Sequence, residues 1–437
     1  MKVDTPPTIA FFPEASFGAA LNCVGIARAL RDRGARPVFI CHAGFTGIFA
    51  DYGFQEYHLP AADGSNDSTE DYWQSFIRRH LPHFNLAPID QIETYVAPTW
   101  EAIVDTAVHA EAPLRAMLRS LGPDAIVLDN VVMFPAVAQA GCPWIRVISC
   151  AETELPDADV PPYLSGLAAD DRAGRIDFLN RYTRAVAPAH ARYNAFRRNH
   201  GLGPLEKGLF LEPSPHLNLM LTPTIVKRPR AQPLDPARFT YLEGCVRREG
   251  PFDLPDFPQN TGPLIYVSFG SLGAMDLALI ERMLAVFAKI PGRFIVNVGG
   301  FQDAYRAVPD NVHLGEWFPQ PSVVAMADLF IHHGGNNSYC EALWHGVPSL
   351  IMPYCWDGHD NAIRAEETGT GRALARASWT EESLTGAIND LLNDSDMKER
   401  LAMNARDMAR RPGVDEAADR ILALAVPSAK REKETTL

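Results

Sequence analysis

The sequence predicts an α/β protein made of two Rossmann-like domains that face each other across a cleft. Three observations predict this fold. The chain has 437 residues, which is too long for one hydrophobic core and suits two. Strand-like and helix-like segments alternate in the first half, and the alternation starts again near residue 264. Between these halves, residues 223–262 hold seven prolines and few periodic apolar positions, which is typical of a crossing between domains.

The first half opens with a strand, a helix and a second strand. Residues 8–12 (TIAFF) form a short apolar run typical of a buried strand. Residues 21–33 have apolar side chains at helical spacing that ends at Gly34, and residues 37–41 (PVFIC) predict the next strand. This order predicts a parallel sheet with helical crossovers. The other elements expected in this half are strands at 125–129 and 144–149, a largely helical insert at 65–121 and a helical stretch at 172–200.

The second half repeats this pattern and predicts a second parallel sheet. Residues 264–269 (LIYVSF) predict a strand and residues 277–288 a helix. In open parallel sheets, ligands bind beyond the carboxyl ends of the strands. Further strands are expected at 293–298, 328–332 and 349–352. We expect domains at 1–225 and 263–415, a linker at 226–262, and a helix or tail at 416–437 that returns to the first domain.

Composition and charge exclude several classes of protein. The net charge of −13 disfavours a nucleic-acid partner, because like charges repel, but it allows a small phosphorylated ligand. The seven cysteines contain no C-x-x-C pair, which predicts free thiols and no zinc ribbon. No run of about 18 apolar residues predicts a membrane span, and the N-terminus lacks the apolar stretch of a signal peptide. We therefore expect a cytoplasmic protein.

Four segments of the second half suit a phosphorylated ligand. They read EWFPQ (316–320), FIHHGGNNSYCE (330–341), GVP (346–348) and PYCWDGHDN (353–361). The second segment predicts a strand ending near His333, a Gly-Gly turn and the start of a polar helix. Free N–H groups at such a helix start, together with the helix dipole, favour a phosphate.

Side chains around this turn add to the predicted site. Asn337 or Ser338 can cap the helix. Glu341, about one turn later, can accept hydrogen bonds from vicinal hydroxyl groups, and Trp317 offers a flat face for a base. Each side chain alone also has an ordinary structural explanation, such as capping or core packing. We favour the ligand site because they occur together in one pattern.

Residues 316–361 resemble the donor-binding signature of the inverting UDP-sugar glycosyltransferases, a family that includes plant secondary-product and bacterial macrolide enzymes. The resemblance is detailed over this segment and extends loosely along the whole chain. It implies the GT-B fold, in which the second of two Rossmann-like domains holds most of the donor.

The resemblance also implies roles for individual residues, carried over by position. Trp317 would stack on the nucleobase, Gln320 would contact the base or ribose, and Glu341 would hold the ribose hydroxyls. Asp357 would contact the transferred sugar, beside Gly358. The diphosphate would be bound by Ser271, His333, Gly335, Asn337 and Ser338.

Two positions depart from the family pattern. Family members carry a catalytic His in the first loop of the first domain, but this chain has Ala19 there, after Gly18. Asp129, which matches the Asp that orients that His, is left without its partner. At the second position, Gly358 replaces the usual Gln, so one amide contact to the sugar is lost. A larger, modified or deoxy sugar is therefore compatible with the site.

The departure at Ala19 leaves the general base open. A positioned base contributes about 10²–10⁴-fold to such a reaction. The candidates are Asp129, Glu14 and His359, each of which also has a structural interpretation as a strand-end or loop residue. Alternatively, an acceptor that is already ionised needs no base.

The expected activity is inverting transfer of a hexose-type sugar to a small organic or natural-product acceptor. The donor is a nucleotide-diphosphate sugar, with UDP expected before TDP. We expect no cofactor and no metal ion, since no metal-binding motif occurs.

Two alternatives stay open. One is a non-catalytic auxiliary homologue, suggested by Ala19, and the other is a nucleotide-sugar epimerase on the same plan. Aromatic residues of the insert indicate a partly apolar acceptor or ordinary core packing: Tyr72, Trp73, Phe76 and Phe84.

Overall fold

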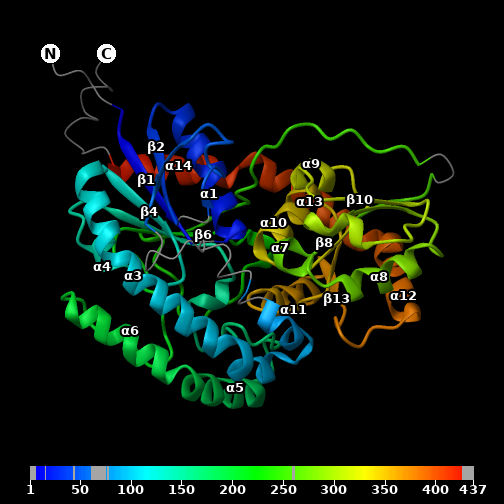
Figure 1. The fold of residues 1–437 in the computed structure, drawn as a ribbon, viewed down its shortest axis with the longest axis horizontal. Helices are drawn as coiled ribbons and strands as arrows, with labels where there is room; N and C mark the ends of the chain where they lie inside the picture. The colour runs from blue at the N-terminus through cyan, green and yellow to red at the C-terminus, as the bar shows by residue number, and fades with distance from the viewer. Residues whose placement is uncertain are drawn as a thin grey trace.

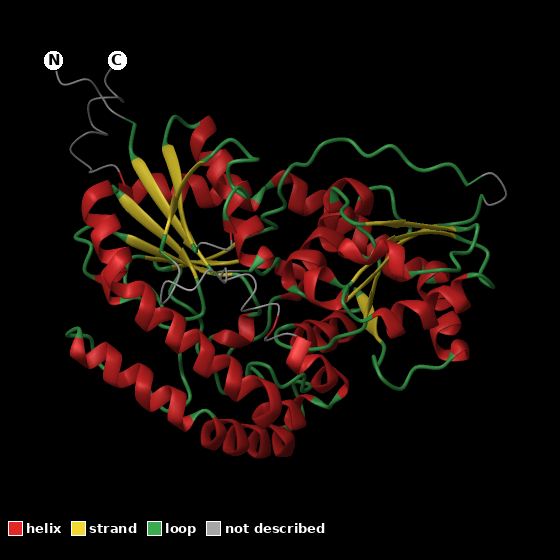
Figure 2. Cartoon of the chain, viewed as in Figure 1, coloured by secondary structure: helices red, strands yellow, loops and turns green. Residues whose placement is uncertain are grey.

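A computed structural model describes residues 6–14, 16–42, 45–60, 75, 78–257 and 261–425, with only the backbone of Phe17 and Ser271. These residues form two lobes, each built on one parallel β-sheet covered by helices (Figure 1). Colouring by secondary structure shows the two sheets as separate groups of strands on either side of the molecule (Figure 2). The predicted architecture of two α/β domains is confirmed.

The first lobe contains a seven-stranded sheet in the order β3-β2-β1-β4-β5-β6-β7. Every ladder in it is parallel, so the carboxyl ends of all its strands lie along one edge. Its strands are β1 (Thr8–Pro13), β2 (Arg36–Cys41), β3 (Gln55–His58), β4 (Ala125–Asp129), β5 (Trp144–Ile148), β6 (Leu217–Met220) and β7 (Phe239–Tyr241).

Helices cover both faces of this sheet. The first helix begins four residues before its predicted start, because the Ser16 side chain accepts a hydrogen bond from the Ala19 N–H and caps it. The predicted helical stretch at 172–200 is two helices that meet at Val186, where Pro188 begins the second. The helices are α1 (Phe17–Asp32), α3 (Ala97–Leu121), α4 (Pro135–Ala138), α5 (Arg172–Ala185) and α6 (Ala187–Asn199).

The second lobe contains a six-stranded parallel sheet in the order β10-β9-β8-β11-β12-β13. Its strands are β8 (Leu264–Ser268), β9 (Arg293–Asn297), β10 (Val312–Gly315), β11 (Leu329–His332), β12 (Ser349–Ile351) and β13 (Gly371–Ala373). Its helices are α7 (Gly270–Gly273), α8 (Leu277–Phe287), α9 (Gln320–Val324), α10 (Asn336–His345), α11 (Gly358–Thr368), α12 (Glu381–Asn393) and α13 (Ser395–Arg410).

The chain crosses between the lobes twice. The first crossing follows β7, which lies inside the segment 226–262 and pairs with β6 in the first sheet. This strand was not expected, because the prolines around it mask its short apolar pattern. The second crossing brings α14 (Gly413–Ala425) back beside α1, and buried residues of α14 such as Ile421 join the core of the first lobe (Figure 1).

All seven cysteines are free, as predicted, and five of them are buried. In the described part of the chain, no helix combines the length and the apolar character that crossing a membrane requires.

Candidate functional site

The turn after β11 is shaped by glycines. Gly334 has a φ of +88°, and a Cβ atom there would lie 2.7 Å from the backbone oxygen of Gly358. A Cβ atom on Gly335 would lie 2.5 Å from Nε2 of His333. Only glycine fits both positions, so the Gly-Gly pair lets the chain turn sharply from the strand into α10 with His333 beside the helix start.

The amino end of α10 points its N–H groups at this turn. Gly335 is the N-cap residue and, having no side chain, does not cap the helix itself. The expectation that Asn337 or Ser338 caps it is wrong, because the helix starts at Asn336 and places both in its first turn. The Asn336 N–H instead donates to Oδ2 of Asp357, at 2.9 Å. The first intrahelical bond runs from Tyr339, so the preceding N–H groups are oriented for an anion.

His333 precedes the two glycines of this turn. Its ring stacks on the ring of Tyr354, with 5.1 Å between the two ring centroids. Burial lowers the pKa of His333 to about 4, with a smaller opposing effect from the Ser268 backbone. The ring is therefore neutral at pH 7 and acts as a hydrogen-bond donor through a single nitrogen. Its Nδ1 atom is shielded from solvent and has no hydrogen-bond partner among the described residues.

Three of the predicted donor-binding residues form one hydrogen-bonded group. Nε2 of Gln320, at the start of α9, donates to Oγ of Ser338 at 3.0 Å and to Oε2 of Glu341 at 2.7 Å. The other carboxylate oxygen of Glu341 accepts from Nη1 of Arg247, at 2.7 Å. The motif analysis missed Arg247, which lies in the crossing segment and carries no pattern that marks it.

Trp317 and Ser271 flank this group. Trp317 follows β10, and 59% of its surface is exposed, an unusual exposure for so large an apolar side chain. Ser271 lies in α7, directly after β8, at the carboxyl edge of the second sheet. Nothing is described of the Ser271 side chain, so its predicted contact with the diphosphate lies outside the described residues.

Asp357 and Gly358 close the other side of the turn. Oδ2 of Asp357 accepts from the Asn336 N–H and, at 3.2 Å, from Nδ2 of Asn361. Burial is the main reason that the pKa of Asp357 is raised to about 7. A Cβ atom on Gly358 would lie 2.5 Å from the backbone oxygen of His333. The glycine that replaces the family's Gln therefore allows the two loops to touch backbone to backbone.

His359 is buried beneath this loop, and its contacts lie in the first lobe. Its Cβ would be 2.9 Å from a Cβ added to Gly166, and burial lowers its pKa to about 4. The next residue, Asp360, accepts hydrogen bonds from Thr153, Leu164 and Gly166. This part of α11 holds the two lobes together.

Acidic residues of the first lobe gather at the carboxyl edge of its sheet. Asp129 ends β4 and is 2% exposed, with Oδ1 accepting from Oγ of Ser149 at 2.6 Å and Oδ2 lying 3.8 Å from Sγ of Cys23. Glu14 follows β1, and its N–H donates to the Asp129 carbonyl at 2.6 Å. Ala19 is buried in the first turn of α1.

These carboxyl groups interact with one another and with Asp357 of the second lobe. Burial raises the pKa of Glu14 to about 7 and that of Asp129 to about 8, and the charge of Glu14 adds to the second shift. Burial and the charges of Asp129 and Asp357 also raise the pKa of Glu154, which the sequence analysis missed. The acids that face each other across the cleft thus favour protonated forms near neutral pH.

The lobes touch directly at this site. Nδ2 of Asn336 donates to the backbone oxygens of Ser149 and Leu221, and Nδ2 of Asn337 donates to that of Gly18 at 2.8 Å. The α10 turn is therefore held against the start of α1, where the family carries its catalytic His. A small hollow of about 10 Å³ lies beside it, between α1, α10 and the crossing segment.

Aromatic side chains line the neighbouring part of the interface. Trp356 has a φ of 55°, a strained conformation for a large residue, and its ring lies 5.5 Å from that of Trp100 and 6.0 Å from that of Tyr163. Phe84 is fully buried and packs on Tyr354 of the second lobe. Three aromatic residues of the predicted insert lie outside the described residues: Tyr72, Trp73 and Phe76.

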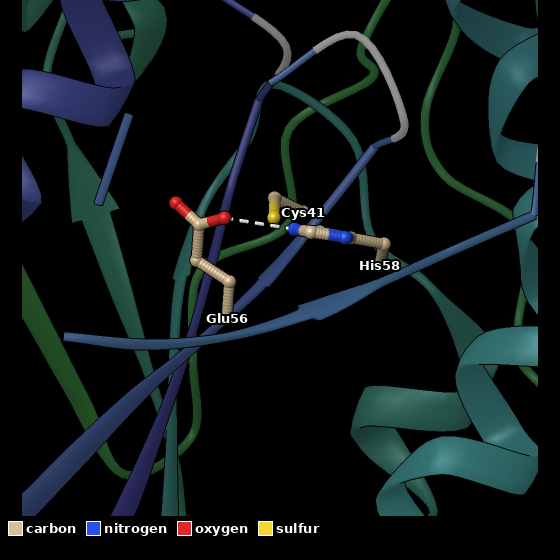
Figure 3. Close-up of side chains that lie close together, drawn as sticks. All are labelled: Cys41, Glu56 and His58. Atoms are coloured by element: carbon tan, nitrogen blue, oxygen red, sulfur yellow. Dashed lines mark hydrogen bonds and ion pairs between the residues drawn. The ribbon is translucent and has the colours of Figure 1, made fainter. Parts of the chain in front are cut away.

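A possible metal-binding group lies elsewhere, on β2 and β3. One ligand atom each from Cys41, Glu56 and His58 lies within 4.8 Å of the others (Figure 3). The Glu56 carboxylate, however, already accepts from His58 and from the N–H groups of residues 47, 49 and 50. These four donors account for its usual acceptor capacity, so the group is explained by anchoring of the 45–50 turn.

Comparison with known proteins agrees with this fold. Residues 281–424 match the model of the family described as "Erythromycin biosynthesis protein CIII-like, C-terminal domain". The oleandomycin glycosyltransferase of Streptomyces antibioticus is 26% identical over 428 residues, which cover 96% of this chain and 91% of that protein. The solved structure of the kitacinnamycin glycotransferase superposes with a TM-score of 0.72 at 23% identity, covering 97% and 99% of the two chains. VinC, solved in complex with DTDP, gives a TM-score of 0.67 at 19% identity, covering 96% and 99%.

Proposed function

Because this chain is a family 1 glycosyltransferase with the GT-B fold, we propose that it transfers a hexose-type sugar, with inversion, from a pyrimidine nucleoside diphosphate to a small natural-product acceptor. The observation that carries this proposal is the Gly334–Gly335 turn. It places the neutral His333 ring and the first N–H groups of α10 around one point at the carboxyl edge of the second sheet. Such a point suits a diphosphate.

Different residues around the turn bind different parts of the donor. The diphosphate takes a hydrogen bond from His333 and from the N–H groups of the first turn of α10, and the helix dipole stabilises the charge that develops on the leaving group. Glu341 and Gln320, already hydrogen-bonded to each other, face the ribose. The exposed indole of Trp317 covers the base, whether uracil or thymine.

The sugar and the acceptor meet between Asp357 and the acids of the first lobe. The Asp357 carboxyl group contacts the sugar, and the loss of the amide contact at Gly358 is compatible with a modified or deoxy sugar. The aromatic surface made by Trp356, Trp100 and Tyr163 suits a partly apolar acceptor. The following predictions remain proposals: domains at 1–225 and 263–415 joined by a linker at 226–262, a cytoplasmic location supported by the free thiols, no cofactor beyond the donor and no metal requirement.

We assign the general base to Glu14 in preference to Asp129 and His359. Both oxygens of Asp129 already lie against Ser149 and Cys23. His359 lies against Gly166 and the Tyr354 backbone. Glu14 lies in the loop that leads from β1 into α1, the helix whose first turn holds Ala19. A pKa near 7 suits proton transfer at neutral pH.

The transfer then proceeds as a single displacement. The acceptor oxygen attacks the anomeric carbon from the side opposite the diphosphate while its proton passes to Glu14. The bond from the anomeric carbon to the phosphate oxygen breaks, and the nucleoside diphosphate leaves with the bonding electrons. Asp129 is protonated near pH 7 and is hydrogen-bonded to Ser149. It therefore adds no second negative charge next to Glu14.

The pH dependence of transfer tests this assignment. A base with a pKa near 7 must be deprotonated to act, so kcat/KM should fall as the pH drops through about 7 and level off above it. Glu14→Gln should lower kcat by about 10²–10⁴-fold at pH 8 while nucleotide affinity is kept. Asp129→Asn is the matched control, with a smaller loss and an unchanged acid limb.

An unchanged kcat in Glu14→Gln would contradict the assignment. If the wild-type protein binds a nucleoside diphosphate sugar but neither transfers nor hydrolyses it at any pH, the non-catalytic auxiliary function suggested by Ala19 replaces the enzymatic one.

A further inference from the structure

The crossing segment inserts one buried arginine into the second lobe. Arg247 is 5% exposed, and its Nη1 atom lies 2.7 Å from Oε1 of Glu341. Its Nε atom donates to Glu249, which also accepts from the Tyr52 hydroxyl of the first lobe at 2.8 Å. The neighbouring Arg248 carbonyl accepts from Arg28 of α1. Arg247 is thus anchored on the first lobe and points its charge at a residue of the second.

Glu341 depends on this charge. The residue is 2% exposed, and burial raises the pKa of its carboxyl group, whereas Arg247 gives the largest opposing effect and Gln320 the next. A carboxyl group that is to accept hydrogen bonds from two hydroxyl groups must be ionised, because a protonated one offers a donor in place of an acceptor. Arg247 also fixes one oxygen in place while Gln320 fixes the other.

A small hollow lies beside this pair. It has a volume of about 10 Å³, roughly the space of one water molecule, and its lining includes Arg247, Glu341 and Asn337, together with Asn22 of α1. The pair therefore lines a space between the two lobes, next to the α10 turn.

We propose that Arg247 is a positioning residue of the donor site, which holds the Glu341 carboxylate ionised and oriented to accept the ribose hydroxyls. The inference rests on the proposed function, since it takes Glu341 as the ribose acceptor. By this proposal, a residue of the linker takes part in nucleotide recognition. Because Arg247 also contacts Glu249, which accepts from Tyr52, the nucleotide site is connected to the first lobe.

Nucleotides that lack the ribose hydroxyls test the proposal. Affinities of UDP, TDP and their 2′,3′-dideoxy counterparts are measured by calorimetry on the full chain. The wild type should lose about 10-fold or more in affinity when the hydroxyls are removed, as hydrogen bonds to a charged group predict. Arg247→Met should shrink this penalty to less than about 3-fold, and Arg247→Lys should restore part of it.

A matched control separates recognition from simple packing. Arg228 lies before β7, on the first-lobe side of the crossing, is also 5% exposed and pairs with Glu367 of the second lobe at 3.0 Å. Arg228→Met should weaken the fold comparably and leave the hydroxyl penalty at its wild-type value. Glu341→Gln should abolish the penalty, and adding Arg247→Met to it should cause no further loss of discrimination.

A change of pH gives a second readout. Besides Arg247, the titratable groups that act on Glu341 or respond to it are Glu249 of the linker, Cys340 of α10 and Tyr266 of β8. Without the guanidinium group, the pKa of Glu341 rises further. The penalty in Arg247→Met should therefore be smaller at low pH and recover as the pH is raised and the carboxyl group ionises.

Three results would count against the proposal in distinguishable ways. The role of Arg247 would be overturned if Arg247→Met at pH 7 lost as much affinity as the wild type does when the ribose hydroxyls are removed. It would also be overturned if Arg228→Met reduced this loss of affinity as much as Arg247→Met does. Binding of UDP or TDP by the wild type with no hydroxyl penalty would overturn it as well, while leaving the donor site intact. No binding of either nucleotide would instead overturn the proposed function.

Discussion

The close approach of neighbouring backbone atoms explains why the site has glycine at two positions. The family's Gln is replaced by Gly358, and the structure gives a physical reason, because any side chain there begins 2.5 Å from the His333 carbonyl. The same closeness fixes Gly334, whose Cβ would meet the Gly358 backbone. Restoring the family residue should therefore harm this chain.

We predict that Gly358→Ala and Gly358→Gln both weaken nucleoside diphosphate binding and destabilise the fold by about 1–3 kcal/mol, because the added atoms push the His333 turn away from α10. The check is calorimetric titration with UDP and TDP together with denaturant unfolding. Gly386→Ala in α12 is the control, since a Cβ atom there meets nothing within 4 Å and should be neutral or slightly stabilising. Tighter binding by Gly358→Gln would contradict this account of the departure.

Asp129 shows that the acids of the cleft cost stability. Its pKa is about 8 in the folded protein and near the ordinary value in the unfolded chain, so the folded state binds its proton more tightly. Stability is then lost as the pH rises from about 4 towards 8. Asp129→Asn keeps the hydrogen bond from Ser149 and removes the charge, so its stability advantage over the wild type should grow with pH, by a few kcal/mol between pH 5 and pH 8.

Denaturant unfolding of both proteins at several pH values measures this difference. If the difference in stability between Asp129→Asn and the wild type does not change with pH, Asp129 is not held protonated.

At the scale of elements, periodicity predicted the buried strands and failed where other signals dominated. Ala125–Asp129 and the helix from Leu277 follow clear apolar patterns and lie where expected. β7 and β13 have three residues each, too short for a pattern, and β3 lies at the sheet edge with polar side chains. The start of α1 was missed because its signal is the capping hydroxyl of Ser16, five residues before the apolar stripe.

The donor motif was easier to predict than its surroundings. Its residues lie within one short stretch, so their order along the chain already places them around one turn. Arg247 and Glu154 reach the same place from distant segments, and nothing in their local sequence marks them. The capping of α10 by Asp357 was missed for the same reason, since the partner comes from another loop.

The last helix gives a test at this scale. Ile421 of α14 is fully buried against the first lobe, although it follows the second lobe in the chain. Ile421→Ala should destabilise the protein by about 2–5 kcal/mol through lost burial and the cavity that remains. Denaturant unfolding checks this, with the half-exposed Met403→Ala of α13 as control. A cost no larger than that of the control would mean that α14 is not part of this core.

At the scale of the whole molecule, the lobes are joined by contacts that converge on the donor turn. Asn336, Asn337 and Asp360 all bridge to the first lobe. The hollow beside the turn, about 10 Å³, holds little more than one water molecule. We therefore expect donor and acceptor to enter when the lobes separate, and the bridging hydrogen bonds to form again when the lobes close.

Calorimetric titration of the double variant Trp317→Ala/His333→Ala with UDP and TDP tests the central claim most directly. The account predicts that the wild type binds at least one of these nucleotides. Saturation at about 100 times the dissociation constant should then stabilise its fold by about 2.7 kcal/mol. The double variant, still folded, should lose most of that affinity and that stabilisation. Nucleotide affinity unchanged by the loss of both rings would contradict the account.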